Sequence, residues 1–275
     1  MTKTVPHSPH VLVFDSGVGA LSIIAEISRQ LPQCSLTYVS DNAFFPYGTR
    51  NEEELVDRVH RVLDACVSDC NPDIIVVACN TASTVALPKV RSHFKQAIVG
   101  VVPAIKPAAQ SSRNKVIGLL ATPATVKRPY TEQLIREFAG DCRIIPIGSS
   151  ELVHWAEKKL RGKSVDQGEI ANIIAPLFAP TESGLADTIV LACTHFPLLK
   201  QELEACARHS VAWIDSGDAI ARRVAYLVDQ LAFEPIQDAR PNYRSIFTLR
   251  NTDIEALSPA VRQWVSGPID FLTIR

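Results

Sequence analysis

The sequence predicts an α/β protein with two pseudo-symmetric, doubly wound domains, each built on a mainly parallel sheet. Short β-branched runs alternate with helical patterns, and two apolar strands end in the same Ala-Cys pair. The 275 residues, 47% of them hydrophobic, can fill more than one core. We expect residues 1–99 with 213–275 to form the first domain and residues 100–212 the second, with the active site in the cleft between them.

Eight short runs rich in Val, Ile or Leu are the expected strands. In chain order they are Val11–Phe14, Ser35–Val39, Asp73–Ala78, Ala97–Val102, Lys115–Leu120, Arg143–Ile147, Thr188–Ala192 and Val211–Ile214. Between Asn51 and Cys70 apolar residues recur at intervals of three and four, which predicts one buried helix face. Because Cys66 and Cys70 lie on that face, we interpret them as core residues rather than as a metal pair.

The two halves of the chain repeat each other loosely. Cys79 and Cys193 both follow an apolar strand that ends in Ala, 114 positions apart. The strands after Cys34 and Cys142, and the strands that begin at Val11 and Val116, form two more pairs in the same order. This order indicates two related halves, although similar offsets also arise by chance in a chain of alternating strands and helices. Ligands of open parallel sheets bind beyond the carboxyl ends of strands, where both thiols are expected.

Composition and charge exclude several classes of partner. The net charge is −1 and there is no run of Lys or Arg, which argues against a nucleic-acid partner. The seven cysteines are an odd number without the spacing of a disulfide framework, which favours a reducing compartment. The first ten residues carry no apolar signal-peptide core, and no later stretch is apolar enough to span a bilayer. We therefore expect a cytoplasmic protein without a membrane partner.

The first Ala-Cys turn continues as Cys79-Asn80-Thr81-Ala82-Ser83-Thr84. It offers a thiol, an amide, hydroxyls and the backbone N–H groups of a starting helix, which together suit a carboxylate. The alternative is a buried structural cysteine followed by a helix cap at Asn80 or Thr81. The second copy of the turn favours the functional interpretation.

That second copy, Cys193-Thr194-His195-Phe196-Pro197, places a histidine two residues beyond the thiol. His195 can polarise the thiol or relay a proton. A Cys-x-His pair can also bind zinc, but the sequence lacks a matching C-x₂-C or H-x₃-H partner, so no metal is expected. A nucleophilic Cys-His hydrolase uses the same two residues, but it leaves Cys79 without a role.

A third motif, Asp15-Ser16-Gly17-Val18-Gly19, follows the first strand. With Asp41 further on it approaches a dinucleotide fingerprint, but Ser22 replaces the third glycine and Asp15 would repel a pyrophosphate. We interpret Asp15 as facing an ammonium group or a thiol. On their own, the stretches 41–48 and 121–126 are typical of a surface loop and a helix cap.

Taken together, these motifs resemble the glutamate racemase branch of the aspartate/glutamate racemase superfamily. The resemblance runs from Asp15 to the turn at 215–217, and the order and spacing of Pro46-Tyr47-Gly48 and of both cysteine motifs agree with it. The stretches Ala121–Lys127 and Leu152–Glu157 look most like proteobacterial members.

The resemblance implies reversible interconversion of L- and D-glutamate without a cofactor or metal, which supplies D-glutamate for peptidoglycan. It implies that Cys79 takes the proton from D-glutamate and Cys193 from L-glutamate, with Asp15 and His195 as further catalytic residues and Asp41 and Glu157 assisting. Contacts to substrate are implied for Asp15, Ser16, Pro46, Tyr47, Gly48, Asn80, Thr81, Thr122, Thr125, Thr194 and His195. Members assemble in different ways, and a homodimer is one candidate.

Two thiols suit this chemistry, because inversion requires removal of a proton from one face of Cα and its return on the other. A thiol pKa near 8.5 lets one cysteine be thiolate while the other stays protonated. We expect the domains to close over the substrate, with crossings near Val99–Ala104 and Ala207–Trp213. Racemisation of aspartate or another acidic amino acid, and non-catalytic binding of an acidic metabolite, stay open as alternatives.

Overall fold

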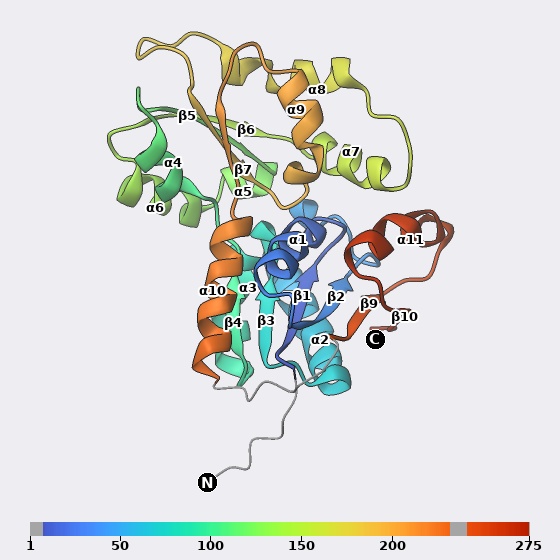
Figure 1. Ribbon diagram of the computed structural model, residues 1–275. Coiled ribbons are helices and arrows are strands. Elements are labelled where there is room, and N and C mark those ends of the chain that lie inside the picture. Colours follow the sequence, from blue (N-terminus) through green and yellow to red (C-terminus); the bar gives the residue numbers. More distant parts are fainter. Residues whose placement is uncertain (1–7, 232–240, 275) are drawn as a thin grey trace. The chain divides into compact units, whose positions relative to one another are not determined.

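The computed structural model describes residues 8–231 and 241–274, and it places a parallel sheet in each half of the chain (Figure 1). Residues 1–101 and 217–275 form unit 1, and residues 102–216 form unit 2. Residues 1–7, part of the stretch in which we expect no signal peptide, lie outside the described residues. In the described part of the chain no helix is long and apolar enough to cross a membrane.

The sheet of unit 1 has six parallel strands in the order β10-β9-β2-β1-β3-β4. Their bounds are β1 His10–Asp15, β2 Ser35–Ser40, β3 Ile74–Val77, β4 Ala97–Gly100, β9 Tyr243–Phe247 and β10 Ile269–Phe271. The central strands are apolar on both faces because helices cover both sides, as a parallel sheet requires.

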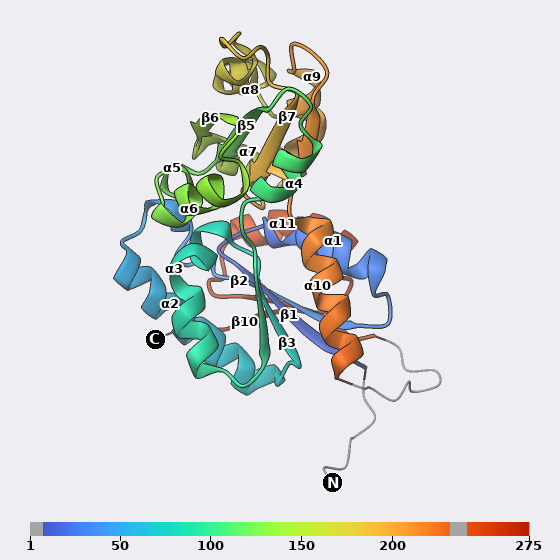
Figure 2. The ribbon, with the colours of Figure 1, turned by 90° about the vertical axis from the view of Figure 1, so that its left-hand side faces the viewer.

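The helices of unit 1 lie in two layers (Figure 2). Their bounds are α1 Ala20–Gln30, α2 Glu52–Cys70, α3 Asn80–His93, α10 Gly217–Gln230 and α11 Thr252–Trp264, with a 3₁₀ turn, η1, at Tyr47–Thr49. Helix α1 packs on α10 and α11 on one face of the sheet. Helices α2 and α3 pack on each other on the opposite face. This confirms the doubly wound prediction for unit 1.

Helix α2 illustrates how the sequence sets an element and its core face. It begins after Asn51, whose side chain accepts a hydrogen bond from the Glu53 N–H, and it ends at Asn71 in the left-handed conformation. Cys66 is fully buried in the core of α2, α3 and the sheet, which confirms its predicted role. Cys70 is only partly buried and packs against the edge of that core.

The sheet of unit 2 has four parallel strands in the order β6-β5-β7-β8. Their bounds are β5 Val116–Ala121, β6 Arg143–Gly148, β7 Thr188–Ala192 and β8 Ala212–Ile214. The order β2-β1-β3-β4 of unit 1 repeats here strand for strand. The strand before Cys79 and the strand before Cys193 thus occupy the same place in their sheets, and the prediction of two related halves is confirmed.

Helices also cover both faces of the second sheet. Their bounds are α4 Ile105–Ser111, α5 Pro123–Val126, α6 Pro129–Phe138, α7 Glu151–Leu160, α8 Gln167–Ile174 and α9 Lys200–Ala205, with 3₁₀ turns η2 Ala175–Phe178 and η3 Phe196–Leu199. Helices α4 and α6 pack on the face that carries Ile117, Leu119 and Val190. On the other face Gly118 lets Leu177 of η2 approach, because a Cβ there would meet its side chain at 3.1 Å.

All eight expected strands are present, and two strands were missed. These are β9 and β10, which extend the first sheet beyond β2. Because of them the C-terminal chain completes unit 1 with sheet as well as helix.

Candidate active site

The turns after β1, β2 and β3 lie side by side at the carboxyl end of the first sheet, because these strands are neighbours in it. They carry Asp15, Asp41 and Cys79. The Asp41 N–H donates to the Asp15 carbonyl at 2.9 Å, and the Ala78 N–H donates to the Phe14 carbonyl at 2.7 Å. The backbone therefore holds the three predicted site residues on one edge.

Cys79 lies in extended backbone directly before α3 and is 7% exposed. Its carbonyl accepts the first helical hydrogen bond, from the Ser83 N–H at 2.8 Å. The Ser83 hydroxyl donates to the Val77 carbonyl at 2.9 Å and accepts from the Val101 N–H at 3.1 Å. The thiol thus sits on a turn whose backbone is fixed from two sides, at the N-terminus of a fourteen-residue helix.

Asn80 carries a buried polar atom that calls for an explanation. Its Oδ1 has no hydrogen-bond partner among the described residues, although the side chain is almost fully buried. Leaving a buried acceptor unpaired is costly, so such an atom commonly marks a place where a ligand donates. Because Asn80 follows Cys79 directly, this acceptor belongs to the turn that carries the thiol, where we predicted a contact with substrate.

Asp15 ends β1 and is fully buried. Its Oδ1 accepts hydrogen bonds from the Ser16 N–H at 2.6 Å and the Ser16 hydroxyl at 3.3 Å. The Tyr38 hydroxyl donates to the Gly17 carbonyl at 2.8 Å, which fixes the turn into α1. The carboxylate therefore has a defined orientation at the sheet edge.

The predicted contacts Pro46, Tyr47 and Gly48 lie in the loop after β2 and in η1. Tyr47 is buried in the same core cluster as Cys79, and its hydroxyl donates to Asp41 Oδ2 at 2.7 Å. Burial holds the pKa of Tyr47 well above its usual value, and the charge and hydrogen bond of Asp41 raise it further. Tyr47 therefore stays a neutral phenol.

In unit 2 a second constellation surrounds Cys193, which follows β7 and is also 7% exposed. Its Sγ lies 3.9 Å from His195 Nδ1, and His195 Nε2 lies 3.1 Å from Glu157 Oε1 on α7. Arg161, one turn further along at the end of α7, donates to Glu157 Oε2 at 3.2 Å. Thiol, imidazole, carboxylate and guanidinium thus form one connected line.

This line can tune the thiol. A carboxylate beside an imidazole favours the protonated ring, and a protonated ring beside a thiol favours the thiolate. Glu157, predicted as an assisting residue, contacts His195, which in turn lies beside Cys193. Sequence reasoning missed Arg161, although its spacing of four residues from Glu157 on one helix is a readable signal.

Thr122 and Thr125 lie at the carboxyl end of β5, the neighbour of β7. Thr122 caps α5: its hydroxyl accepts from the Thr125 N–H at 3.2 Å, and the two hydroxyls lie 3.0 Å apart. Thr131 donates to the Thr125 carbonyl at 2.7 Å. The helix-cap interpretation thus holds for this turn, and contact with substrate stays a prediction.

The structure therefore gathers the predicted site residues in two groups, one at the carboxyl end of each sheet. Unit 1 holds Asp15, Ser16, Asp41, Pro46, Tyr47, Gly48, Cys79, Asn80 and Thr81, and unit 2 holds Thr122, Thr125, Glu157, Cys193, Thr194 and His195. Within the described ranges, no three His, Cys, Asp or Glu side chains are grouped so that they could hold a metal ion.

The family comparison agrees with this fold and these turns. Residues 11–224 match the family model described as Asp/Glu/Hydantoin racemase, and this range includes all of unit 2, residues 11–101 of unit 1 and both cysteine motifs. The chain therefore belongs to the Asp/Glu/hydantoin racemase family, and the class of protein is an isomerase.

Comparison with individual relatives narrows the resemblance within this family. The glutamate racemase of Sodalis glossinidius is 44% identical over 267 residues, 97% of this chain and 91% of the relative. That of Proteus mirabilis is 53% identical over 222 residues, 80% of this chain and 76% of the relative. The crystal structure of Escherichia coli glutamate racemase, in complex with L-glutamate and the activator UDP-MurNAc-ala, superposes with a TM-score of 0.91 at 42% identity, covering 98% of this chain and 100% of the other. All three of these relatives are glutamate racemases.

Proposed function

We propose that this chain interconverts L- and D-glutamate by direct proton transfer, with Cys79 and Cys193 as the two bases on opposite faces of Cα. The observation that carries the proposal is the repeated Ala-Cys turn after β3 and β7, equivalent strands of two sheets with the same topology. A single thiol would exchange the proton and return it to the same face. A pair supplies the inversion.

In the direction from L- to D-glutamate, the Cys193 thiolate takes the Cα proton and becomes a thiol. The Cys79 thiol then gives its proton to the opposite face of the carbanion and becomes a thiolate. The reverse reaction begins from that swapped state, so each direction uses the opposite protonation pattern. No electron leaves the substrate, and the number of protons is conserved.

The residues beside Cys79 suit the charged ends of an amino acid. The N–H groups at the start of α3 suit the α-carboxylate, onto which charge moves when the carbanion forms. The unpartnered Asn80 Oδ1 and the Asp15 carboxylate are acceptors, which suit the ammonium group. On the other side, His195 with Glu157 supports Cys193 as a thiolate.

The carbanion needs a dry site, because water weakens each of these electrostatic contacts. We therefore propose that water is excluded from the substrate while the two thiols act on it. All seven cysteines are free thiols, which supports action in a reducing cytoplasm. Supply of D-glutamate for peptidoglycan and assembly as a homodimer are further parts of the proposal, and light scattering tests the latter.

The test is incubation of the purified chain with L-glutamate in deuterated water without added cofactor. Loss of optical rotation together with deuterium incorporation at Cα is the expected result. Cys79→Ser and Cys193→Ser should each abolish racemisation. The matched control is Cys66→Ser, a buried thiol of the core, which should lower the free energy of unfolding and leave racemisation intact.

Each other outcome points elsewhere. Racemisation of aspartate with no reaction of glutamate would move the chain to another acidic substrate. No reaction with any acidic amino acid would favour a binding protein. Equal activity of all three serine variants would remove the two-thiol mechanism.

A further inference from the structure

The carboxylate of Asp41 is fully buried and accepts four hydrogen bonds. Arg58 donates to both oxygens, from Nε to Oδ2 at 2.9 Å and from Nη2 to Oδ1 at 2.6 Å. The Tyr47 hydroxyl donates to Oδ2 at 2.7 Å and the Thr248 hydroxyl to Oδ1 at 2.7 Å. Such a bidentate, fully paired arrangement fixes both partners in geometry as well as in charge. Asp41 is therefore linked to the site around Cys79 through Tyr47. It does not act there as a separate acid.

Besides Tyr47 of the same loop, these partners come from two other segments of unit 1. Arg58 lies on α2, and Thr248 lies directly after β9 in the C-terminal chain. Thr248 is tied to the loop after β2 twice more: its Oγ1 accepts from the Ala43 N–H at 3.0 Å, and its N–H donates to the Ser40 carbonyl at 3.2 Å. The loop is thus held from the helix side and from the strand that sequence analysis missed.

The loop between Asp41 and η1 is also packed by aromatic contacts. The ring centroids of Phe44 and Tyr47 lie 6.1 Å apart, and those of Phe14 and Tyr47 lie 6.2 Å apart. The guanidinium of Arg50 lies 4.2 Å from the Phe44 ring centroid, on the loop's own chain. The Tyr47 hydroxyl, which donates to Asp41, therefore belongs to a ring that the loop packs on several sides.

Tyr47 in turn lies near Cys79, because η1 packs on α3, the helix that begins directly after Cys79. Both belong to the buried core cluster between the first sheet and helices α2 and α3, which also includes Val77 and Ala82. A negative charge on the Cys79 sulfur raises the pKa of Tyr47, after the larger effects of burial and of Asp41. The position of the Tyr47 ring and of the following Gly48 N–H therefore depends on how Asp41 is held.

We infer that Arg58 and Thr248 are positioning residues of the racemase: through Asp41 they fix Tyr47 and Gly48 as one wall of the substrate site beside Cys79. This inference rests on the proposed function, which places Tyr47 and Gly48 against glutamate. It gives the strand β9 a part in the site, and it assigns Asp41 the role of anchor for the loop. In this role Arg58 and Thr248 act through Asp41 rather than by contact with the substrate.

The sharpest variant is Thr248→Val, which keeps the shape of the side chain and removes its hydroxyl. Loss of one hydrogen bond from a held carboxylate should raise KM for glutamate about three- to tenfold, while kcat changes by less than about twofold. Arg58→Lys keeps the positive charge and loses the bidentate contact with Asp41. We expect the same result, a higher KM with little change in kcat. Arg58→Gln leaves a buried carboxylate without its cation, so its folding is checked first by thermal unfolding.

Two matched controls separate positioning from stability. Thr37→Val removes a buried hydroxyl of β2 that bonds His10 at 2.8 Å, at the other end of the strands. Arg244→Gln removes an arginine of β9 that pairs with Asp69 and Asp270. Both should lower the melting temperature and leave KM unchanged.

A second readout does not depend on turnover. In the absence of glutamate, iodoacetamide modifies thiols, and peptide mass spectrometry gives the rate at Cys79 relative to Cys193. In Thr248→Val the loosened wall should raise this ratio at least about threefold, since exposure and mobility control access. An unchanged KM, or an unchanged ratio, in a folded Thr248→Val protein overturns the inference.

The failure of the proposed function looks different. A wild-type chain that racemises no acidic amino acid removes the proposed function, and the thiol ratio alone then decides whether Arg58 and Thr248 hold Tyr47 beside Cys79. A wild-type chain that racemises glutamate while the variants behave like Thr37→Val removes only the positioning role.

Discussion

Single thiols in this chain differ by their surroundings rather than by their covalent chemistry. Burial raises the pKa of Cys66 to about 12, and burial together with the charge of Asp73 raises that of Cys34 to about 11. Cys79 and Cys193 instead occupy polar turns, Cys79 directly before α3 and Cys193 beside His195. The buried core thiols therefore stay protonated, whereas the two turns place their thiols where they can take part in proton transfer.

This difference predicts a pattern of alkylation. In the native protein at pH 8, iodoacetamide should modify Cys79 and Cys193, and Cys34 and Cys66 should stay unmodified because well under about 1% of each is thiolate. Labelling of Cys34 should rise only as the pH approaches 11. Peptide mass spectrometry of timed samples measures it, and modification of Cys66 as fast as Cys193 at pH 8 would contradict the interpretation.

The line from Cys193 to Glu157 leads to a second residue-scale prediction. Glu157→Gln keeps the shape of the side chain and removes the negative charge beside His195, whose ring lies next to the Cys193 thiol. We expect kcat/KM to fall about tenfold in both directions, which corresponds to about 1.4 kcal/mol of lost transition-state stabilisation.

Its matched control is Glu202→Gln on α9. Glu202 pairs with Lys159 at 2.8 Å in the same unit and lies outside the Cys193 line. The Glu202→Gln variant should lose stability at most and keep its kcat/KM. A kcat/KM for Glu157→Gln that equals that of Glu202→Gln would count against the relay.

At the scale of elements, the strands and helices with a regular local pattern were predicted from the sequence. The strands that depend on pairing with distant neighbours were missed. The eight strands with continuous apolar runs and the periodic helix α2 were all recognisable. Strand β9 reads Tyr-Arg-Ser-Ile-Phe, and β10 has three residues, so neither shows a clean pattern. Their hydrogen bonds come from β2 and from each other, which no local pattern encodes.

The same reasoning separates the site residues. The repeated motif predicted Cys79 and Cys193, and their flanking polar residues came with them. Arg58 and Thr248 carry no local signal, because each acquires its partner only when α2 and β9 reach the loop after β2. Long-range contacts of single polar side chains are what one sequence cannot show.

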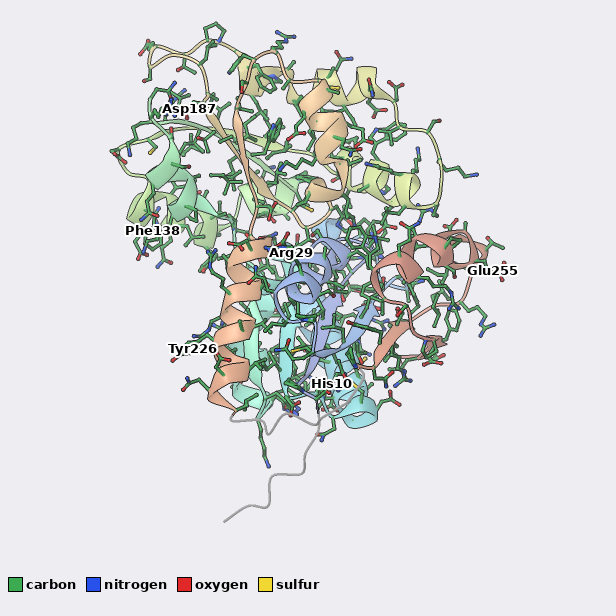
Figure 3. The ribbon with its side chains drawn as sticks, in the orientation of Figure 1. His10, Arg29, Phe138, Asp187, Tyr226 and Glu255 are labelled. Atoms are coloured by element: carbon green, nitrogen blue, oxygen red, sulfur yellow. The ribbon has the colours of Figure 1, made fainter. Side chains whose placement is uncertain are left out.

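Asp187 gives a prediction for the joint between α4, β5 and β7 (Figure 3). Its carboxylate accepts from the Ser112 and Thr188 hydroxyls at 2.6 and 3.0 Å and from the backbone N–H groups of Arg113 and Asn114 at 2.7 and 3.1 Å. Burial alone would raise its pKa, but these donors together hold the pKa of Asp187 below its ordinary value.

A pKa that is lower in the folded state stabilises the fold above the unfolded pKa, near 3.9, and that stability is lost as the pH falls through the folded value. Asp187→Asn should therefore cost about 1–2 kcal/mol at pH 7, and the difference from wild type should shrink below about pH 4. Urea unfolding at several pH values measures it. The exposed Glu137→Gln on α6 is the control, and a difference that is constant with pH would contradict the account.

At the scale of the whole molecule, the two units share one topology and have diverged in what surrounds it. Unit 1 takes β9, β10, α10 and α11 from the C-terminal chain, and unit 2 keeps four strands. The equivalent thiols thus have different neighbours: a tyrosine held by Asp41 near Cys79, and a histidine held by Glu157 near Cys193. Unequal surroundings suit a reaction in which the two thiols begin in opposite protonation states.

If the two thiols serve one substrate, glutamate must protect both at once. We expect added D- or L-glutamate to slow iodoacetamide modification of Cys79 and Cys193 with the same concentration dependence, because one bound molecule covers both. The same titration should raise the melting temperature, since a ligand that binds only the folded chain stabilises it by RT ln(1 + [L]/Kd). Cys142 and Cys206, which are partly exposed in unit 2, are the controls and should react at an unchanged rate. Protection of one active thiol without the other, or at a clearly different glutamate concentration, would mean that the two turns belong to separate sites, and the two-base mechanism would then fail even if each cysteine were essential.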